Sequence, residues 1–171
     1  MKKIVSILCV LALVFASCEK KEDGGKDSKS SKLPEYAELD GVKYFKFPPM
    51  DLYGLDNERC AMKIEEDYSE YEFDSYVGDA AVYNAICREN RNLFYFTNEG
   101  WEMSKVRIEM STSVLPAKDL AQILNNAGIT SDGRTSDGNG LKYKVPGDKL
   151  VLIVTQSGST LNLDFCDKKY Y

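Results

Sequence analysis

The sequence predicts an α+β domain, in which a mainly antiparallel sheet of several short strands carries one or two helices on one face. Two observations favour this class. β-Prone runs recur along the chain with turn residues between them, and residues 116–127 carry a clear helical period. A curved β-rich sheet or a partly closed barrel is the alternative. The order of the predicted elements disfavours a parallel doubly wound fold.

The chain divides into three parts. Residues 1–17 begin with two lysines and continue in an apolar run that only Ser6 interrupts. This run is shorter than the roughly 20 residues that span a bilayer, and it is typical of a secretory signal peptide. Residues 18–32 contain no apolar residue after Cys18, so we expect a disordered tether. Residues 33–171 have the length of one globular domain.

Phe15-Ala16-Ser17-Cys18 at the end of the signal peptide resembles the lipobox of bacterial lipoproteins, with Phe15 where that family usually has leucine. The resemblance implies cleavage before Cys18 and lipid on the sulfur and the amino group of Cys18. Several acyl chains on one residue give a firm membrane anchor, so the membrane is an expected partner. An ordinary cleaved signal peptide with a coincidental cysteine and an uncleaved membrane helix are the alternatives.

Lys21-Glu22-Asp23 follows the cysteine closely and is similar to the export signal of surface-exposed lipoproteins of the Bacteroidetes type. This resemblance implies a protein that is lipid-anchored in the outer membrane with its domain at the cell surface. A periplasm-facing anchor is the competing expectation.

Two segments in the first half of the domain predict strand pairs. In residues 36–47, Asp40-Gly41 is a turn signal between two short strands. In residues 60–65, alternating apolar positions predict a strand. The apolar parity then changes across residues 68–70, which predicts a turn and a hairpin that continues to residue 76.

The middle of the chain predicts helices on either side of a hairpin. Asp79 is a suitable N-cap for a helix over residues 79–90, with a strand as the alternative. Residues 93–97 and 101–111 flank a short glycine-containing connection and predict a hairpin. Residues 116–127 predict a helix that Gly128 ends.

The last part of the chain predicts a loop and a meander. Residues 130–140 are rich in turn residues and predict a mobile loop. Residues 141–145, 149–155 and 160–166 are three β-prone runs that predict consecutive antiparallel strands. Because residues 150–154 are all apolar, that strand should be covered on both faces.

The composition argues against an enzyme. The chain has no histidine, which excludes Ser-His-Asp and Cys-His catalysis and every histidine-based metal site. It contains no nucleophile elbow and no phosphate-binding glycine loop. The acidic loop at 130–140 fails the EF-hand pattern, because Arg134 and Tyr143 stand where ligands are needed. The sequence therefore predicts no catalytic residues, no metal site and no cofactor, with hydrolysis by paired carboxylates as the alternative.

Three cysteines fall in the domain, at Cys60, Cys87 and Cys166, and none of them has CxxC spacing. Outside the cytoplasm two of them could form a disulfide, and the sequence does not favour one pairing over another. Buried thiols are the other expectation.

The domain has 15 Lys and Arg against 23 Asp and Glu, so nucleic acid is an unfavourable partner. An acidic stretch over residues 65–76 is interleaved with tyrosines, and tyrosine and tryptophan are common in recognition surfaces. The candidate ligand-binding residues are Tyr68, Tyr71, Tyr76 and Trp101. A solvated acidic strand pair with packed aromatic rings is the alternative interpretation.

Two functions follow from these observations. The first is a membrane-anchored lipoprotein of the cell envelope that carries a small non-catalytic domain for binding a peptide, a glycan or a protein. The second is an accessory or structural subunit of an envelope complex, which would show a larger apolar patch or an unpaired edge strand.

Overall fold

The computed structural model describes residues 32–85, 90–97 and 100–171. Its strands are β1 (Tyr36–Leu39), β2 (Val42–Lys46), β3 (Tyr71–Val77), β4 (Ala80–Ala85), β5 (Asn90–Phe96), β6 (Met103–Ser111), β7 (Thr130–Arg134), β8 (Leu141–Lys144), β9 (Leu150–Ser157) and β10 (Thr160–Asp167). Its helices are α2 (Asn57–Asp67) and α3 (Ala117–Asn126).

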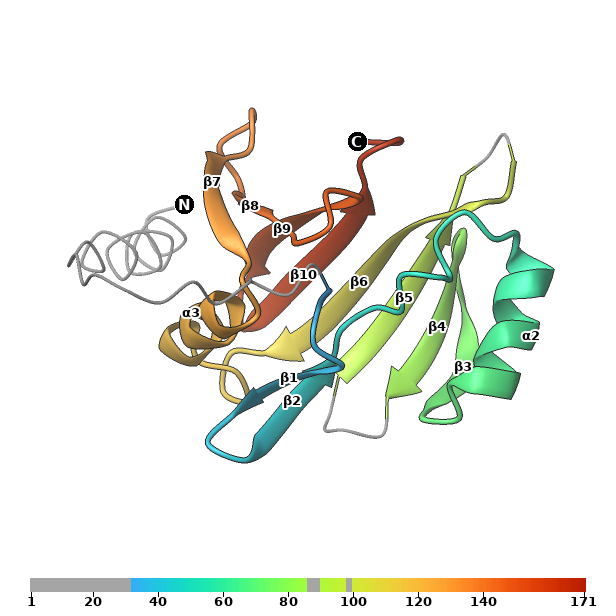
Figure 1. Cartoon of the computed structure of the whole chain (residues 1–171), viewed down its shortest axis with the longest axis horizontal. Coiled ribbons are helices and arrows are strands. Elements are labelled where there is room, and N and C mark those ends of the chain that lie inside the picture. Colours follow the sequence, from blue (N-terminus) through green and yellow to red (C-terminus); the bar gives the residue numbers. More distant parts are fainter. Residues whose placement is uncertain (1–31, 86–89, 98–99) are drawn as a thin grey trace.

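Within these ranges an open eight-stranded sheet has the order β3-β4-β5-β6-β10-β9-β8-β7, and every pairing in it is antiparallel. β1 and β2 form a separate hairpin that lies against this sheet together with α3 (Figure 1). The predicted α+β class is confirmed. The sheet is open, with β3 and β7 at its two edges, so the alternative of a partly closed barrel does not apply.

The large sheet consists of two meanders. β3 to β6 are paired in chain order, and so are β7 to β10. The two meanders meet at the pairing of β6 with β10, where Ile108 lies opposite Leu163 and Arg107 lies opposite Asp164. This pairing, which we call the seam, places residues of one meander beside residues of the other across the middle of the sheet.

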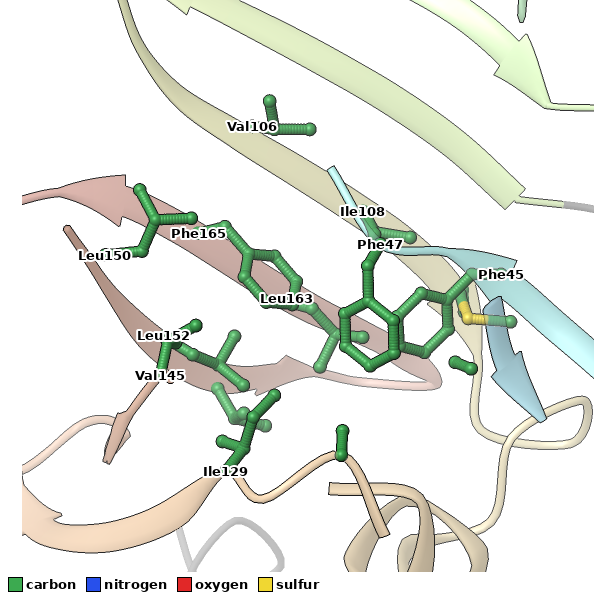
Figure 2. Close-up of a cluster of buried hydrophobic side chains, with 14 of the residues drawn as sticks. Phe45, Phe47, Val106, Ile108, Ile129, Val145, Leu150, Leu152, Leu163 and Phe165 are labelled. Atoms are coloured by element: carbon green, nitrogen blue, oxygen red, sulfur yellow. The ribbon is translucent and has the colours of Figure 1, made fainter. Parts of the chain in front are cut away.

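The core lies between one face of this sheet and the elements that cover it. Figure 2 shows Val106 and Ile108 of β6 and Leu163 and Phe165 of β10 in one cluster with Phe47. The covering helices contribute the apolar positions Cys60, Ile64, Leu120, Ile123 and Leu124. We call the opposite face of the sheet the outer face. It carries the alternate positions of β6, which are Lys105, Arg107 and Glu109.

β9 is buried on both faces, as its apolar run predicts. Leu150, Leu152 and Val154 belong to the main core. Val151 and Ile153 point to the outer face and are nevertheless only 3% and 8% exposed. The outer face is therefore covered locally at β9, and this cover forms part of the site described below.

The strand predicted over residues 60–65 is wrong, because these residues belong to α2. Asp56 caps the helix, and its Oδ1 accepts a hydrogen bond from the backbone N–H of Arg59 at 2.8 Å. Cys60 and Ile64 are one helical turn apart and both are buried, while Met62 is 54% exposed. The turn at residues 68–70 therefore joins a helix to β3, and the predicted hairpin there is also wrong.

The helix predicted over residues 79–90 is wrong, and the strand alternative is correct. Gly78 and Asp79 form the turn between β3 and β4, and Gly78 has a φ of 57°. Ala80 and Val82 face one side of the sheet and Ala81 and Tyr83 face the other, and all four are buried. Burial of both faces removes the alternation that identifies a strand. Residues 86–89 lie outside the described residues.

The loop predicted over residues 130–140 is confined to residues 135–140, and its mobility stays a prediction. Residues 130–134 form β7, which pairs irregularly with β8 between Ser131 and Arg134. The composition Thr-Ser-Asp-Gly-Arg has a low strand propensity, so pairing with β8 decides the structure here.

The other predicted elements are confirmed. Asp40 and Gly41 have φ values of 52° and 77° in the β1–β2 turn, as a two-residue hairpin loop requires. β5 pairs with β6, α3 begins after Pro116 and ends before Gly128, and β8, β9 and β10 are consecutive neighbours.

Candidate functional site

The four aromatic residues that the sequence nominates do not form one site. Tyr71 is 6% exposed, and its ring packs edge-on against Phe94 at 5.6 Å between centroids, so it is a core residue. Tyr68 donates a hydrogen bond to Asp51 Oδ1 at 2.7 Å and lines a separate groove. Tyr76 and Trp101 are each 62% exposed and line the same hollow, so this pair alone is brought together.

Backbone contacts place Trp101 beside the first turn of α2. Asp56 forms an isolated antiparallel bridge with Glu102, and the N–H of Met103 donates to the carbonyl of Leu55 at 2.7 Å. The start of β6 is thereby attached to the segment that leads into α2. Trp101 itself has a φ of 53°, which is unusual for a residue with a bulky side chain.

The hollow between Trp101 and Tyr76 is shallow and measures about 400 Å³. The other residues that line it are Asp56, Asn57, Glu58 and Ala61. Phe73 is 49% exposed, and its ring centroid lies 5.2 Å from that of Tyr76. We call Phe73, Tyr76 and Trp101 the aromatic patch. Phe73 lay in the tyrosine-rich stretch of the sequence but was not among the nominated residues.

A second hollow, of about 500 Å³, lies on the outer face of the sheet, and we call it the sheet cleft. Its residues come from the seam, from β9, from the loop between β7 and β8 and from the C-terminus. They are Tyr95, Ser104, Lys105, Thr135, Ser136, Asp137, Asn139, Gly140, Ile153, Thr155, Asp164, Cys166, Asp167, Tyr170 and Tyr171. In Figure 1 the β7–β8 loop and the C-terminus project beyond the same end of the sheet.

One wall of the sheet cleft is the β7–β8 loop, which internal hydrogen bonds hold in shape. Thr135 Oγ1 donates to Asp137 Oδ1 at 2.6 Å, and the N–H and the side-chain amide of Asn139 each donate to the same carboxylate at 3.1 Å. These bonds, from Thr135 first and then from Asn139, hold the pKa of Asp137 below its usual value. Gly140 lets the loop lie close to β9, because a Cβ there would lie 3.0 Å from Thr155 Cγ2.

The other wall is the C-terminal segment, which Glu102, the residue before β6, holds in place. The Tyr170 hydroxyl donates to the Glu102 carboxylate. Lys169 Nζ lies 3.1 Å from the same carboxylate. The Tyr171 ring is 58% exposed in this wall, with Lys142 Nζ at 5.4 Å from its centroid.

The floor of the sheet cleft contains a paired charge at the seam. Arg107 donates to both carboxylate oxygens of Asp164, at 2.7 and 2.8 Å. These hydrogen bonds raise the pKa of Arg107 further above its already high value. Lys105 Nζ lies 3.8 Å from the centroid of the Tyr95 ring. The charge of Asp164 is thus neutralised within the protein.

The two cysteines that the structure describes are free thiols. Cys166 is half-buried in the sheet cleft and Cys60 is buried in the core. Burial, followed by nearby carboxylates, raises the pKa of each thiol to about 12, so neither is a thiolate at neutral pH. Cys87 lies outside the described residues, as do Cys18 and the Lys21-Glu22-Asp23 segment.

Within the described ranges, no group of three or more Cys, Asp or Glu side chains is arranged to hold a metal ion. No helix in the same ranges is both long enough and apolar enough to cross a membrane.

Most residues of the sheet cleft were not predicted from the sequence. Tyr170 and Tyr171 are two adjacent aromatic residues that follow the strand predicted over residues 160–166. This pair is the sequence feature that could have indicated the site. The loop at 130–140 was recognised by composition, but its position over β9 depends on pairings between distant strands. Comparisons with protein-family models, with curated proteins and with solved structures find no match to this chain.

Proposed function

We propose that this chain is a lipid-anchored protein of the cell envelope whose folded domain is a non-catalytic binding module, with the sheet cleft as its site for a saccharide. The observation that carries this proposal is a preformed hollow whose lining combines tyrosine rings with side chains that bear hydroxyl and amide groups. Its volume of about 500 Å³ is within the usual range of ligand pockets.

The side chains of the sheet cleft suit a sugar. A sugar ring has apolar C–H faces that pack on an aromatic ring and hydroxyls that need polar partners. Tyr170 and Tyr171 offer rings on one wall, while Ser136, Asn139 and Thr155 offer polar groups on the other wall and the floor. Arg107 neutralises Asp164 in the floor, so a neutral ligand can bind there without breaking this ion pair.

The saccharide site is tested by affinity electrophoresis of the full chain, purified in detergent, through gels that contain soluble starch, xyloglucan or galactomannan. We expect at least one of these neutral polysaccharides to retard the protein, and Tyr171→Ala to abolish most of the retardation. Trp101→Gly is the matched control and should migrate like the unmodified chain. Absence of retardation by all three polymers, or retardation that persists in Tyr171→Ala, would contradict the proposed site.

The lipid anchor is tested in cells. The membrane fraction should contain the unmodified protein, and Cys18→Ser should release it, because the lipid acceptor is lost. Treatment of intact cells with a non-permeant protease then tests the proposed surface location. Loss of the domain, with a periplasmic control protein spared, supports surface exposure, whereas protection supports the periplasm-facing alternative.

The aromatic patch favours a second candidate function, that of an accessory subunit that docks onto a larger complex. Phe73 and Tyr76 lie on the edge strand β3, and the exposed Trp101 lines the same hollow as Tyr76. Single-chain proteins seldom expose several large aromatic rings together. This candidate requires a protein partner at a surface different from the sheet cleft.

A further inference from the structure

We propose that the hollow between Tyr76 and Trp101 binds an arginine or lysine side chain from an exposed segment of a partner protein. This surface is separate from the sheet cleft, because the two hollows share no residue. The proposal therefore does not depend on the saccharide site.

Aromatic exposure is the first observation. Tyr76 and Trp101 are each 62% exposed, although the core of the domain buries other aromatic rings, such as Tyr143 and Phe94, almost completely. The face of a tryptophan or tyrosine ring attracts a cation within about 6 Å of its centroid, and tryptophan does so most strongly. A guanidinium or ammonium group is thus a favourable occupant of the space between the two rings.

Charge is the second observation. The lining of the hollow includes the carboxylates of Asp56 and Glu58 and contains no Lys or Arg. In the parts of the chain that the structure describes, no basic side chain pairs with Glu58. Asp56 uses Oδ1 to cap α2 and has Arg59 Nε at 3.4 Å from Oδ2. A basic group from outside would complete the charge balance and would form charge-assisted hydrogen bonds.

The surroundings of the hollow indicate a protein segment rather than a small cation. The hollow is open and shallow. β3 and α2, which supply Tyr76 and Ala61 to the hollow, also carry exposed apolar side chains, among them Phe73 and Met62, which are 49% and 54% exposed. A peptide can place its basic side chain between the rings and its apolar neighbours on Phe73 and Met62. A lone ion would leave these apolar side chains in water.

Backbone strain is the third observation. Trp101 has a φ of 53°, a conformation that glycine adopts freely and tryptophan rarely does. Such strain persists where the surrounding structure holds it, and it is concentrated at functional positions. The consequence here is that a large ring is presented to solvent beside two carboxylates.

Trp101 is the only tryptophan, so its fluorescence reports on this hollow directly. The test is a titration of the full chain in detergent with a blocked peptide that contains two arginines and one phenylalanine. We expect a saturable change in tryptophan fluorescence. The same peptide with glutamate in place of both arginines should bind roughly tenfold more weakly or not at all.

Two conservative variants separate charge from folding. Asn caps a helix as well as Asp does, so Asp56→Asn keeps α2 while it removes the charge. Asp56→Asn and Glu58→Gln should each weaken binding of the arginine peptide roughly three- to tenfold and leave the midpoint of unfolding unchanged. Tyr171→Ala, in the sheet cleft, is the matched control and should bind the peptide normally.

The proposal is overturned if the arginine and glutamate peptides bind equally well, or if neither changes the fluorescence at millimolar concentration. It is also overturned if a neutral polysaccharide alone changes the fluorescence, because that result assigns the hollow to a glycan. Unchanged arginine binding in both charge variants would remove the electrostatic basis of the proposal.

Discussion

At the scale of single residues, Trp101 is held in a backbone conformation that costs stability. Because its φ is 53°, replacement by glycine relieves strain that replacement by alanine keeps. We expect Trp101→Gly to have a free energy of unfolding about 0.5–1 kcal/mol higher than Trp101→Ala, measured by urea denaturation. A lower value for the glycine variant would show that the left-handed conformation at this position is not strained.

Gly140 occupies a position where an added side chain would be tightly packed. A Cβ would lie 3.0 Å from Thr155 Cγ2 and 3.2 Å from Ile153 Cγ2, and both of these belong to β9. We expect Gly140→Ala to lower the free energy of unfolding by about 1–3 kcal/mol and to displace the β7–β8 loop. Urea denaturation measures the loss. Ser136→Ala, in the same loop, is the control and should have little effect.

The stability of the domain should fall in alkaline solution because buried tyrosines resist ionisation. Burial raises the pKa of Tyr143 and of Tyr83 from 10.0 to about 12. A raised pKa in the folded state contributes stability below pH 10, and this contribution is lost as the pH rises from 10 to about 12. Urea midpoints measured across this range should fall, and Tyr143→Phe should reduce the slope. A constant midpoint would contradict the shift.

At the scale of elements, the seam between β6 and β10 contains an ion pair, and loss of one member leaves the charge of the other without a partner. Arg107 is bonded to both oxygens of Asp164, and Asp164 is 8% exposed. Arg107→Ala leaves this carboxylate without its partner, so we expect a loss of about 2–3 kcal/mol.

The double variant Arg107→Met with Asp164→Leu replaces both charges by apolar groups, and we expect it to lose less stability than Arg107→Ala alone. Urea denaturation of the three proteins forms the comparison. A larger loss in the double variant would indicate that the ion pair adds net stability to the seam.

β6 and α3 were predicted correctly because each has one buried and one solvated face. β6 alternates between Val106 or Ile108 in the core and Arg107 on the outer face, and α3 has a continuous apolar stripe, so both were identified. β4 is buried on both faces, which removed its alternation and made a helix plausible. In α2, Met62 and Ile64 are apolar residues at alternate positions, and this spacing is typical of a strand although Met62 is exposed. The feature that indicates a helix here is the N-cap at Asp56.

The candidate sites were less predictable than the elements, because each combines segments that are distant in the sequence. Tyr76 lies in β3 and Trp101 lies just before β6, and the Asp56–Glu102 bridge attaches the segment before α2 to the start of β6 beside this hollow. Tyr71, five residues from Tyr76, is buried. Strict alternation would put these two tyrosines on opposite faces of β3, but the irregularity between Phe73 and Ser75 changes the register, so Phe73 pairs with Tyr83 and Tyr76 pairs with Ala81 on the same face. Which of the two is exposed therefore depends on what covers that face, and the sequence does not show this.

At the scale of the whole molecule, the fold is supported by packing and sheet pairing, without covalent crosslinks between the described cysteines. Cys60 and Cys166 are free, and the described residues contain no metal-binding cluster. We expect the thermal midpoint of the full chain in detergent to be the same with and without dithiothreitol, and with and without EDTA. A drop with dithiothreitol would reveal a disulfide that involves Cys87, and a drop with EDTA would reveal a bound metal.

The division of the sheet into two meanders joined at a single seam also has a consequence for how the chain reaches this structure. Every other pairing in the large sheet joins strands that are consecutive in the sequence, whereas Arg107 and Asp164 at the seam are 57 residues apart. Contacts between residues that are distant in the sequence slow folding, so we expect formation of the seam to be a slow step. Until the seam forms, β6 and β10 each present an unpaired edge, and β10 of one molecule matches β6 of another equally well. At high concentration the chain is therefore prone to exchange its C-terminal meander between two molecules and form a domain-swapped dimer.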